Sequence, residues 1–445
     1  MSRVDFGEIT RNFFFNNSTL NVQMSEGQLF KATAHESQLA TGTPQEYDFQ
    51  KAIRPLFGKQ GLNTNGMGSH PDFLHLENCD HTENHYIATL FLDIKRSSRL
   101  NLLLPLKQAA IVKNRILQAA IDVVRSFDGV PHRLMGDALM AFFGGKSICK
   151  EDAIVNAINA SNTLRLIMRD YVFPSLNERL STDIELAVRV GLDFGDTDEI
   201  LWSCYGFGNA TEVTAHGLQV DFASKLQSQA RSNSTMLGQT LINFIDFPKE
   251  YSEIKESAGQ QELHVKPNIT DQNGNSINYS CRLIKGDHYQ RLLPFPPEVK
   301  SGKQDIPKLR SNSAFSFSCE VYDTENDWVP YPSLSRCLDK GLSLKFRVQV
   351  RSAALTGMGK LKVEFYKHNH GNEAEKENSA QEHITGTKYL SPTTNPKYRQ
   401  PDRVHEATLD EYTSYRGLHT MRAKVSSERD SGNVLFEDWI GVYIK

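Results

Sequence analysis

Two apolar stretches, YIATLFLDI at residues 86–94 and RLMGDALMAFFG at residues 133–144, determine the predicted fold. The first is a continuous apolar run ending in an acid, which is typical of a buried central strand. The second indicates two strands joined by a tight turn at Gly136–Asp137. Neighbouring strands of one sheet share an edge, so we expect Asp93 and Asp137 to lie close together.

The sequence around these strands predicts helices that cover the sheet. Apolar residues recur at helical spacing between Pro105 and Phe127, and a second helix is expected at about Glu151–Tyr171. The strand LAVRVGLDFG at residues 186–195 follows, and then a helix near Glu212–Gln229. The order strand, helix, hairpin, helix, strand, helix predicts an α+β fold, in which helices pack on an antiparallel-rich sheet.

Composition shifts along the chain predict four segments. Residues 1–80 form a polar N-terminal extension with one short helix around Tyr47–Leu56, and residues 81–293 form the sheet-and-helix domain, with last strands at Glu262–Lys266 and Tyr279–Ile284. A linker is expected at 294–314. Alternating apolar residues then return at 342–350, 360–366, 418–426 and 434–444, and they predict a small β-rich C-terminal domain over 315–445.

Bulk properties exclude several classes of function. The formal net charge of −3 gives no positive field for nucleic acid or anionic membrane. No 18-residue apolar run and no signal-peptide pattern occur, so a cytoplasmic protein without a membrane span is expected. The six cysteines are widely spaced, which favours reduced structural thiols over a zinc site of clustered cysteines.

Two small groups of residues are candidates for chemistry. Asp93 and Asp137 would offer hard oxygen ligands for Mg²⁺ or Mn²⁺, although single acids at strand ends are more often solvated caps. Thr214, Gly217, Asp221 and Lys225 are spaced for one face of a helix, where Asp221 and Lys225 could equally form a surface ion pair. Arg133 is unusual in an apolar strand, and the simplest alternative is a charge extending from the sheet edge to solvent.

Taken together, these motifs resemble the class III nucleotidyl cyclases from Tyr86 to about Ile284. The resemblance rests on FLDI with Asp93, RLMGDALMAFFG with Asp137, VRVGLDFG and GLQVDFASKL. It implies a cyclase-type sheet and a site for two Mg²⁺ or Mn²⁺ ions held by Asp93, Asp137 and the backbone carbonyl of Ile94. The segment after Phe315 loosely resembles the sensor-type domain that follows some bacterial cyclases.

The resemblance also assigns the substrate-binding positions. Arg133 and Thr214 match the two base-reading positions, Asp221 stands where an Asn usually orients the ribose, and Lys225 stands where an Arg usually stabilises the triphosphate. Both purine-reading residues are changed while both aspartates are kept. This pattern resembles the pyrimidine cyclases of Pycsar anti-phage systems, which make cyclic UMP or cyclic CMP.

The resemblance implies a homodimer, because the family builds each site from two catalytic domains and this chain has one. Its cyclic nucleotide product would act on a separate effector protein. Arg133 offers only hydrogen-bond donors, which favours the O4 acceptor of uracil, so UTP is the expected substrate. CTP stays open as the substrate, and so does a catalytically inactive nucleotide-binding sensor.

Overall fold

The computed structural model describes residues 4–15, 47–181, 183–208, 210–301, 309–322, 327–392 and 402–445. Its first part is built on a seven-stranded sheet of order β3-β4-β2-β5-β8-β12-β9. These strands are β2 (Ile87–Lys95), β3 (Val130–Met135), β4 (Ala138–Phe143), β5 (Ala187–Gly195), β8 (Ser234–Gly238), β9 (Ser252–Glu253) and β12 (Cys281–Ile284). Only β5 and β8 pair in parallel, so the predicted antiparallel-rich sheet is confirmed.

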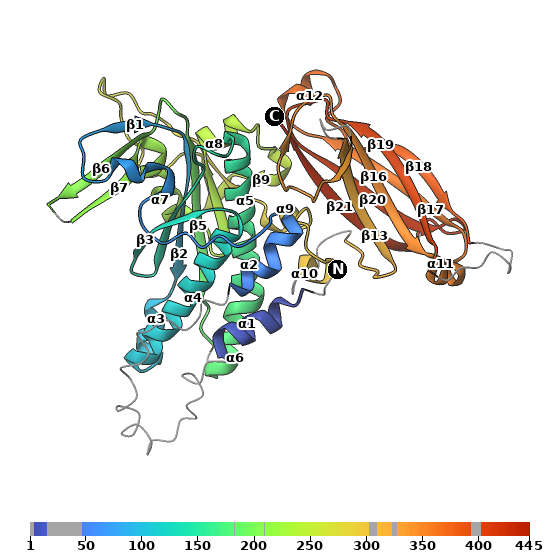
Figure 1. The fold of residues 1–445 in the computed structure, drawn as a ribbon, viewed down its shortest axis with the longest axis horizontal. Helices are drawn as coiled ribbons and strands as arrows, with labels where there is room; N and C mark the ends of the chain where they lie inside the picture. Colours follow the sequence, from blue (N-terminus) through green and yellow to red (C-terminus); the bar gives the residue numbers. More distant parts are fainter. Residues whose placement is uncertain are drawn as a thin grey trace, which may run out of the picture.

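Helices cover one face of this sheet (Figure 1). They include α4 (Leu106–Ser126) and α5 (Lys150–Ile167), which continues through a π-helical turn at Met168–Val172 into α6 (Phe173–Leu180). Alternation along β2 directs Leu90, Leu92 and Ile94 into the core that they share with these helices. The predicted helices at Pro105–Phe127 and Glu151–Tyr171 are therefore confirmed within a few residues.

The opposite face of the sheet supports α7 (Leu218–Gln229) and a small three-stranded sheet. That sheet has the order β1-β6-β7, with β1 (Thr82–Asn84), β6 (Leu201–Phe207) and β7 (Ala210–His216). A second core joins the two sheets, and it contains Phe142, Trp202 and Val213. Asp93 lies on this face of the large sheet, because its register partner Ala138 is two residues from Met140 of the second core.

One predicted helix is wrong at its start. Helix α7 begins at Leu218, and the residues from Ala210 to His216, predicted as helix from Glu212 onward, form strand β7. Thr211, Val213 and Thr214 are β-branched and fit a strand, and Gly217 keeps an extended backbone before the helix begins. Thr214 therefore does not share a helix face with Asp221 and Lys225.

A second prediction, of a strand at Glu262–Lys266, is also wrong. Strand β11 (Gln260–Glu262) pairs with β10 (Lys255–Ser257) in a separate two-stranded hairpin, and His264 makes only an isolated bridge to Ser280. The strand predicted at Tyr279–Ile284 is present as the shorter β12, which joins the main sheet.

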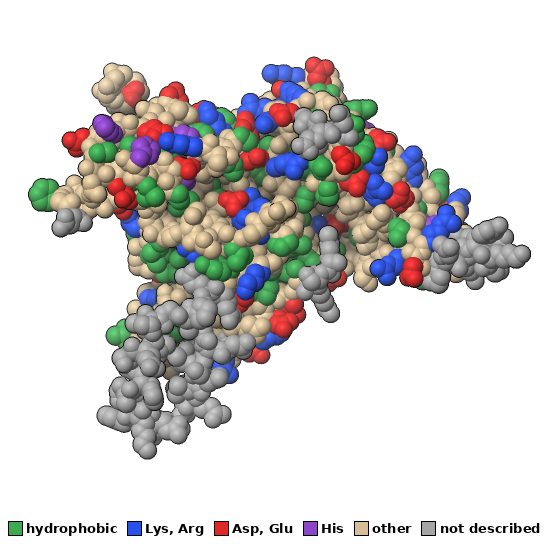
Figure 2. Space-filling model, viewed as in Figure 1, with side chains coloured by type: hydrophobic (Ala, Val, Ile, Leu, Met, Phe, Trp, Pro, Cys, Tyr) green, Lys and Arg blue, Asp and Glu red, His purple; other side chains and the backbone are tan. Residues whose placement is uncertain are grey.

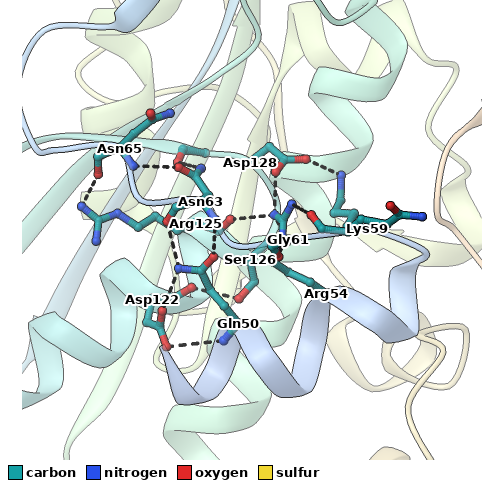
Figure 3. Close-up of polar contacts among 12 residues, drawn as sticks. Gln50, Arg54, Lys59, Gly61, Asn63, Asn65, Asp122, Arg125, Ser126 and Asp128 are labelled. Carbon is teal, nitrogen blue, oxygen red and sulfur yellow. Dashed lines mark hydrogen bonds and ion pairs between the residues drawn. The ribbon is translucent and has the colours of Figure 1, made fainter. Parts of the chain in front are cut away.

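The described residues of the N-terminal extension pack against the helices that cover the large sheet. Phe6 and Phe14 of α1 (Phe6–Phe15) and Phe49 of α2 (Asp48–Ile53) belong to the main core. Buried Asp122 of α4 accepts hydrogen bonds from the Phe49 amide at 2.9 Å and from Gln50 Nε2 at 3.0 Å (Figure 3). Burial raises the pKa of Asp122 to about 6. The short helix predicted around Tyr47–Leu56 is confirmed as α2 followed by a 3-10 turn, Arg54–Phe57.

The C-terminal part is β-rich, as the sequence predicted, and its strands form a two-sheet sandwich. Its sheets have the orders β14-β13-β16-β19 and β15-β21-β20-β17-β18, and both contribute to one core. The strands are β13 (Phe315–Tyr322), β14 (Trp328–Pro330), β15 (Cys337–Leu338), β16 (Ser343–Arg351), β17 (Leu361–Asn369), β18 (His383–Leu390), β19 (Val404–Tyr412), β20 (Gly417–Ser427) and β21 (Val434–Ile444).

Short elements complete the described parts of the chain. They are the 3-10 turns Pro71–Leu76 and η5 (Lys249–Tyr251), and the helices α3 (Ser98–Leu103), α8 (Gln239–Phe244), α9 (Gly286–Gln290), α10 (Pro297–Ser301), α11 (Ser352–Met358) and α12 (Asn372–Lys376). Among all the helices described, none is both long and apolar enough to cross a bilayer.

Candidate active site

The predicted metal ligands meet at one end of the large sheet. Strand pairing places Asp93 opposite Ala138, the residue after Asp137. The Ser97 hydroxyl, in the turn after β2, donates to Asp137 Oδ2, and the Ser97 amide donates to the Ile94 carbonyl at 3.3 Å. Gly136 adopts a φ of 68° in the β3–β4 turn, a conformation that favours glycine. The two carboxylates and the carbonyl therefore share one end of the sheet, and hard oxygen donors of this kind suit Mg²⁺ or Mn²⁺.

Arg189 lies beside Asp93, on β5, the strand that neighbours β2 in the sheet. Arg189 of β5 is the register partner of Asp93 and donates to its carboxylate at 2.5 Å. The Arg189 side chain is about one quarter exposed, so it can reach a ligand that enters from solvent. An arginine beside two carboxylates also supplies charge for binding phosphate groups.

The base-reading candidates form a second group, on β3 and β7. Arg133 of β3 forms an ion pair with Glu212 of the β6–β7 hairpin. The Glu212 Oε2 atom lies 3.3 Å from Arg133 Nε. Alternation along β7 puts Glu212 and buried Thr214 on one face of the strand. The structure thus brings Arg133 close to the strand that contains Thr214, and it adds a carboxylate that the sequence did not single out.

Helix α7 holds Asp221 and Lys225 on the same face of the sheet as the aspartates. Gly191 of β5 allows this close approach, because a Cβ there would lie 2.1 Å from the Ala223 carbonyl oxygen. Asp221 is exposed in the first turn of α7, and the Lys225 ammonium lies 5.1 Å from the centre of the Phe222 ring. In the described residues, no ion pair joins Asp221 to Lys225, so the surface-pair alternative is not observed.

The two groups of candidate residues remain separate within one chain. Across the described ranges, no hydrogen bond or ion pair links Asp93 or Asp137 to Asp221 or Lys225. Large apolar side chains are exposed near the acidic end of the sheet and on the β6–β7 hairpin, namely Leu102, Leu103, Leu106, Tyr205 and Phe207. Figure 2 shows hydrophobic side chains at the outer end of that hairpin.

Sequence reasoning missed three residues of this region, Ser97, Arg189 and Glu212. Arg189 lies inside the VRVGLDFG motif, where strand alternation could have placed it on the face of Asp93. Glu212 would have been found if residues 210–216 had been recognised as a strand, since it then shares a face with Thr214.

Both parts of the chain are similar to known proteins. Residues 298–445 match the family model of the adenylyl/guanylyl and SMODS C-terminal sensor domain. A cytidylate cyclase from Escherichia coli is 45% identical over 404 residues, which cover 90% of this chain and 88% of that protein. A cytidylate cyclase from Staphylococcus aureus is 30% identical, over 88% of this chain and 86% of that protein.

Among solved structures, an adenylyl cyclase from P. aeruginosa aligns with 46% of this chain and 95% of its own, with a TM-score of 0.38 and 18% identity. The protein is a class III nucleotidyl cyclase, as the sequence indicated. This class is defined by the motifs in their order along the chain, by the sheet and by the paired aspartates. The chain belongs to the family of the two cytidylate cyclases above, the Pycsar-type pyrimidine cyclases.

Proposed function

We propose that this protein converts CTP to 3′,5′-cyclic CMP and pyrophosphate, and that it does so as a homodimer in bacterial antiviral defence. The observation behind the choice of base is the grouping of Arg133, Glu212 and Thr214 on facing strands. The names of the relatives support the same choice. The expectation from sequence was UTP, because it rested on the donors of Arg133. It did not include the Glu212 carboxylate beside them.

Glu212 reverses the hydrogen-bond argument for the base. Cytosine presents an amino donor at position 4 and acceptors at N3 and O2, so a carboxylate can accept from the amino group while Arg133 donates to the acceptors. Uracil would bring its O4 acceptor against the Glu212 carboxylate, which opposes two acceptors. Hydrogen-bond mismatches of this kind can discriminate strongly between substrates.

Cyclisation requires the ribose 3′-oxygen to attack the α-phosphorus in line while pyrophosphate leaves. Asp93, Asp137 and the Ile94 carbonyl would hold two Mg²⁺ or Mn²⁺ ions, which lower the pKa of the attacking hydroxyl and neutralise phosphate charge. Asp221 would orient the ribose through its hydroxyl groups. Lys225, with Arg189 near the metal ligands, would stabilise charge on the triphosphate.

A two-chain site accounts for the separation of the two groups. We propose that the metal-binding residues of one chain face Arg133, Thr214, Asp221 and Lys225 of a second copy, which gives two equivalent sites about a two-fold axis. Exposed Leu102, Leu103 and Leu106 lie at the end of α3 and the start of α4, the elements that follow β2 in the chain, and would be covered in such a dimer.

The choice of base is tested by kcat/KM for CTP and UTP in the wild type and in Glu212→Gln. We expect the wild type to prefer CTP, and we expect the preference to fall by at least about tenfold in the variant, since glutamine can donate to uracil O4. Glu253→Gln removes another arginine–glutamate pair, Arg231–Glu253 at 3.0 Å, and serves as the matched control. A wild-type preference for UTP would overturn the cytidine assignment.

A further inference from the structure

A cluster of two histidines and a glutamate lies between the two parts of the chain, away from the cyclase motifs. Glu250 belongs to η5, while His368 lies near the end of β17 and His370 just after it. One possible ligand atom from each residue lies within 4.8 Å of the others. We propose that Glu250, His368 and His370 form a binding site for one divalent transition-metal ion of the zinc class.

His370 provides the first argument for a ligand. Its side chain is 2% exposed, and neither ring nitrogen has a hydrogen-bond partner in the structure. Its Nδ1 lies 3.4 Å from Glu250 Oε2, close enough for both atoms to approach one ion. Buried polar atoms are nearly always satisfied, but His370 Nε2 has no partner and the contact from Nδ1 to Glu250 is longer than an ordinary hydrogen bond, which together indicate an absent ligand.

His368 is already held as a metal ligand would be. Its Nε2 lies 3.2 Å from the Ala380 carbonyl oxygen, an arrangement that places the proton on Nε2 and leaves the Nδ1 lone pair free. Metal-binding histidines usually make this contact with their second nitrogen. The His368 and His370 rings are 3.8 Å apart between centres, so both can approach one ion.

The ligand types select the metal. Two imidazoles and one carboxylate suit zinc and similar ions, whereas Mg²⁺ prefers oxygen ligands alone. A tetrahedral zinc ion holds its ligand atoms about 3.4 Å apart, so small rotations would close the cluster around it. Glu250 is half exposed and can make this adjustment, and a water molecule would supply the fourth ligand.

The site would join the catalytic part to the C-terminal sandwich (Figure 1). The two parts already meet beside the cluster, where Asp246 accepts from the Asn372 amide at 2.5 Å and Arg416 donates to the Phe244 carbonyl. An ion with one ligand from the first part and two from the second would add a bond across this joint.

The experiment measures Zn²⁺ binding to the full chain by calorimetry and Co²⁺ binding by absorption spectroscopy. All proteins carry Asp93→Asn and Asp137→Asn, so that the proposed catalytic metal site does not contribute. We expect one equivalent of Zn²⁺, a tetrahedral Co²⁺ spectrum and a Zn²⁺-dependent rise in Tm. Glu250→Gln and His368→Ala each remove one ligand. Each should weaken Zn²⁺ binding by more than about 100-fold, which is the cost that loss of an outer-shell contact can reach.

Controls keep the outcomes distinct. His405→Ala removes a histidine that bonds Ser352 at 3.0 Å in the same sandwich, and it should bind Zn²⁺ as the parent does. His370 is buried and is left unchanged in these experiments. Glu250 is half exposed, so Glu250→Gln is the variant that preserves both the fold and the shape of the side chain. No stoichiometric Zn²⁺ binding by the parent, or equal affinity in the parent and in both ligand variants, would overturn the proposal.

Discussion

Asp93 and Asp137 are held in place by neutral and cationic groups rather than left as free surface acids. Arg189 donates to Asp93, and the Ser97 hydroxyl donates to Asp137. These contacts fix both carboxylates at one end of the sheet, so they would bind a metal ion there without a large rearrangement. Each aspartate can therefore be replaced by its isosteric amide with little disturbance of the strands.

We predict that Asp93→Asn and Asp137→Asn each reduce turnover by at least about 100-fold, because a neutral amide is a poor ligand for Mg²⁺ or Mn²⁺. Pyrophosphate release measures turnover, and circular dichroism with size-exclusion chromatography checks that fold and assembly are unchanged. Near-normal turnover in both folded variants would remove the basis for the metal assignment.

At the residue scale, the sequence predicted that Asp93 and Asp137 share one end of the sheet, which the structure shows, but it did not find Glu212 beside Arg133. Asp93 and Asp137 lie in local motifs whose turn and strand pattern the sequence itself defines. Glu212 is 79 residues from Arg133, and only the packing of β7 over the large sheet brings them together. A contact of this kind depends on tertiary structure and has no local signal.

At the element scale, strands were predicted more reliably where their apolar residues ran continuously or alternated regularly. The central strand, the hairpin after it and the four C-terminal strands are present as expected. The helix near Glu212 was extended too far because Thr214, Gly217 and Asp221 happen to follow helical spacing. The β-branched residues before Gly217 favour a strand, and residues 210–216 form one.

The contact between α2 and α4 gives a prediction about pH. Burial raises the pKa of Asp122 to about 6 in the folded chain, above its ordinary value, so folding favours the protonated form. The folded state then binds more protons than the unfolded state between about pH 4 and pH 6, and the contribution of Asp122 to stability falls as pH rises through this window.

The measurement compares urea unfolding of the wild type and Asp122→Asn at pH 4.5 and pH 7. Relative to the variant, the unfolding free energy of the wild type should fall as pH rises. The whole titration of Asp122 corresponds to up to about 3 kcal/mol, and most of this change lies between pH 4.5 and pH 7. A wild type that gains stability relative to Asp122→Asn as pH rises would contradict the assigned direction.

At the scale of the whole molecule, one chain holds each half of the proposed site but does not join them. A mixture of Asp137→Asn and Lys225→Ala chains should therefore recover activity. In a random mixture about half of the dimers are hybrids with one intact site of two, so activity should approach about a quarter of the wild type. Native mass spectrometry confirms that hybrids form, and inactive hybrids would argue against a site shared between chains.

The whole-molecule organisation was only partly accessible from sequence. The β-rich C-terminal part was predicted from alternating apolar residues. Its packing against the catalytic part was not, because that contact depends on single buried residues such as Tyr289 and Tyr443, whose hydroxyls lie 3.3 Å apart. Such contacts are set by shape across two folded units, and neither segment shows them alone.

The most direct test of the proposed function is the identity of the product. The purified full-length protein is incubated with Mn²⁺ and each of the four ribonucleoside triphosphates, and products are identified by mass spectrometry against the Asp137→Asn variant. We predict 3′,5′-cyclic CMP and equimolar pyrophosphate from CTP, with far less product from UTP, ATP or GTP and none from the variant. Efficient formation of a cyclic purine nucleotide, or no cyclic product from any nucleotide, would contradict it.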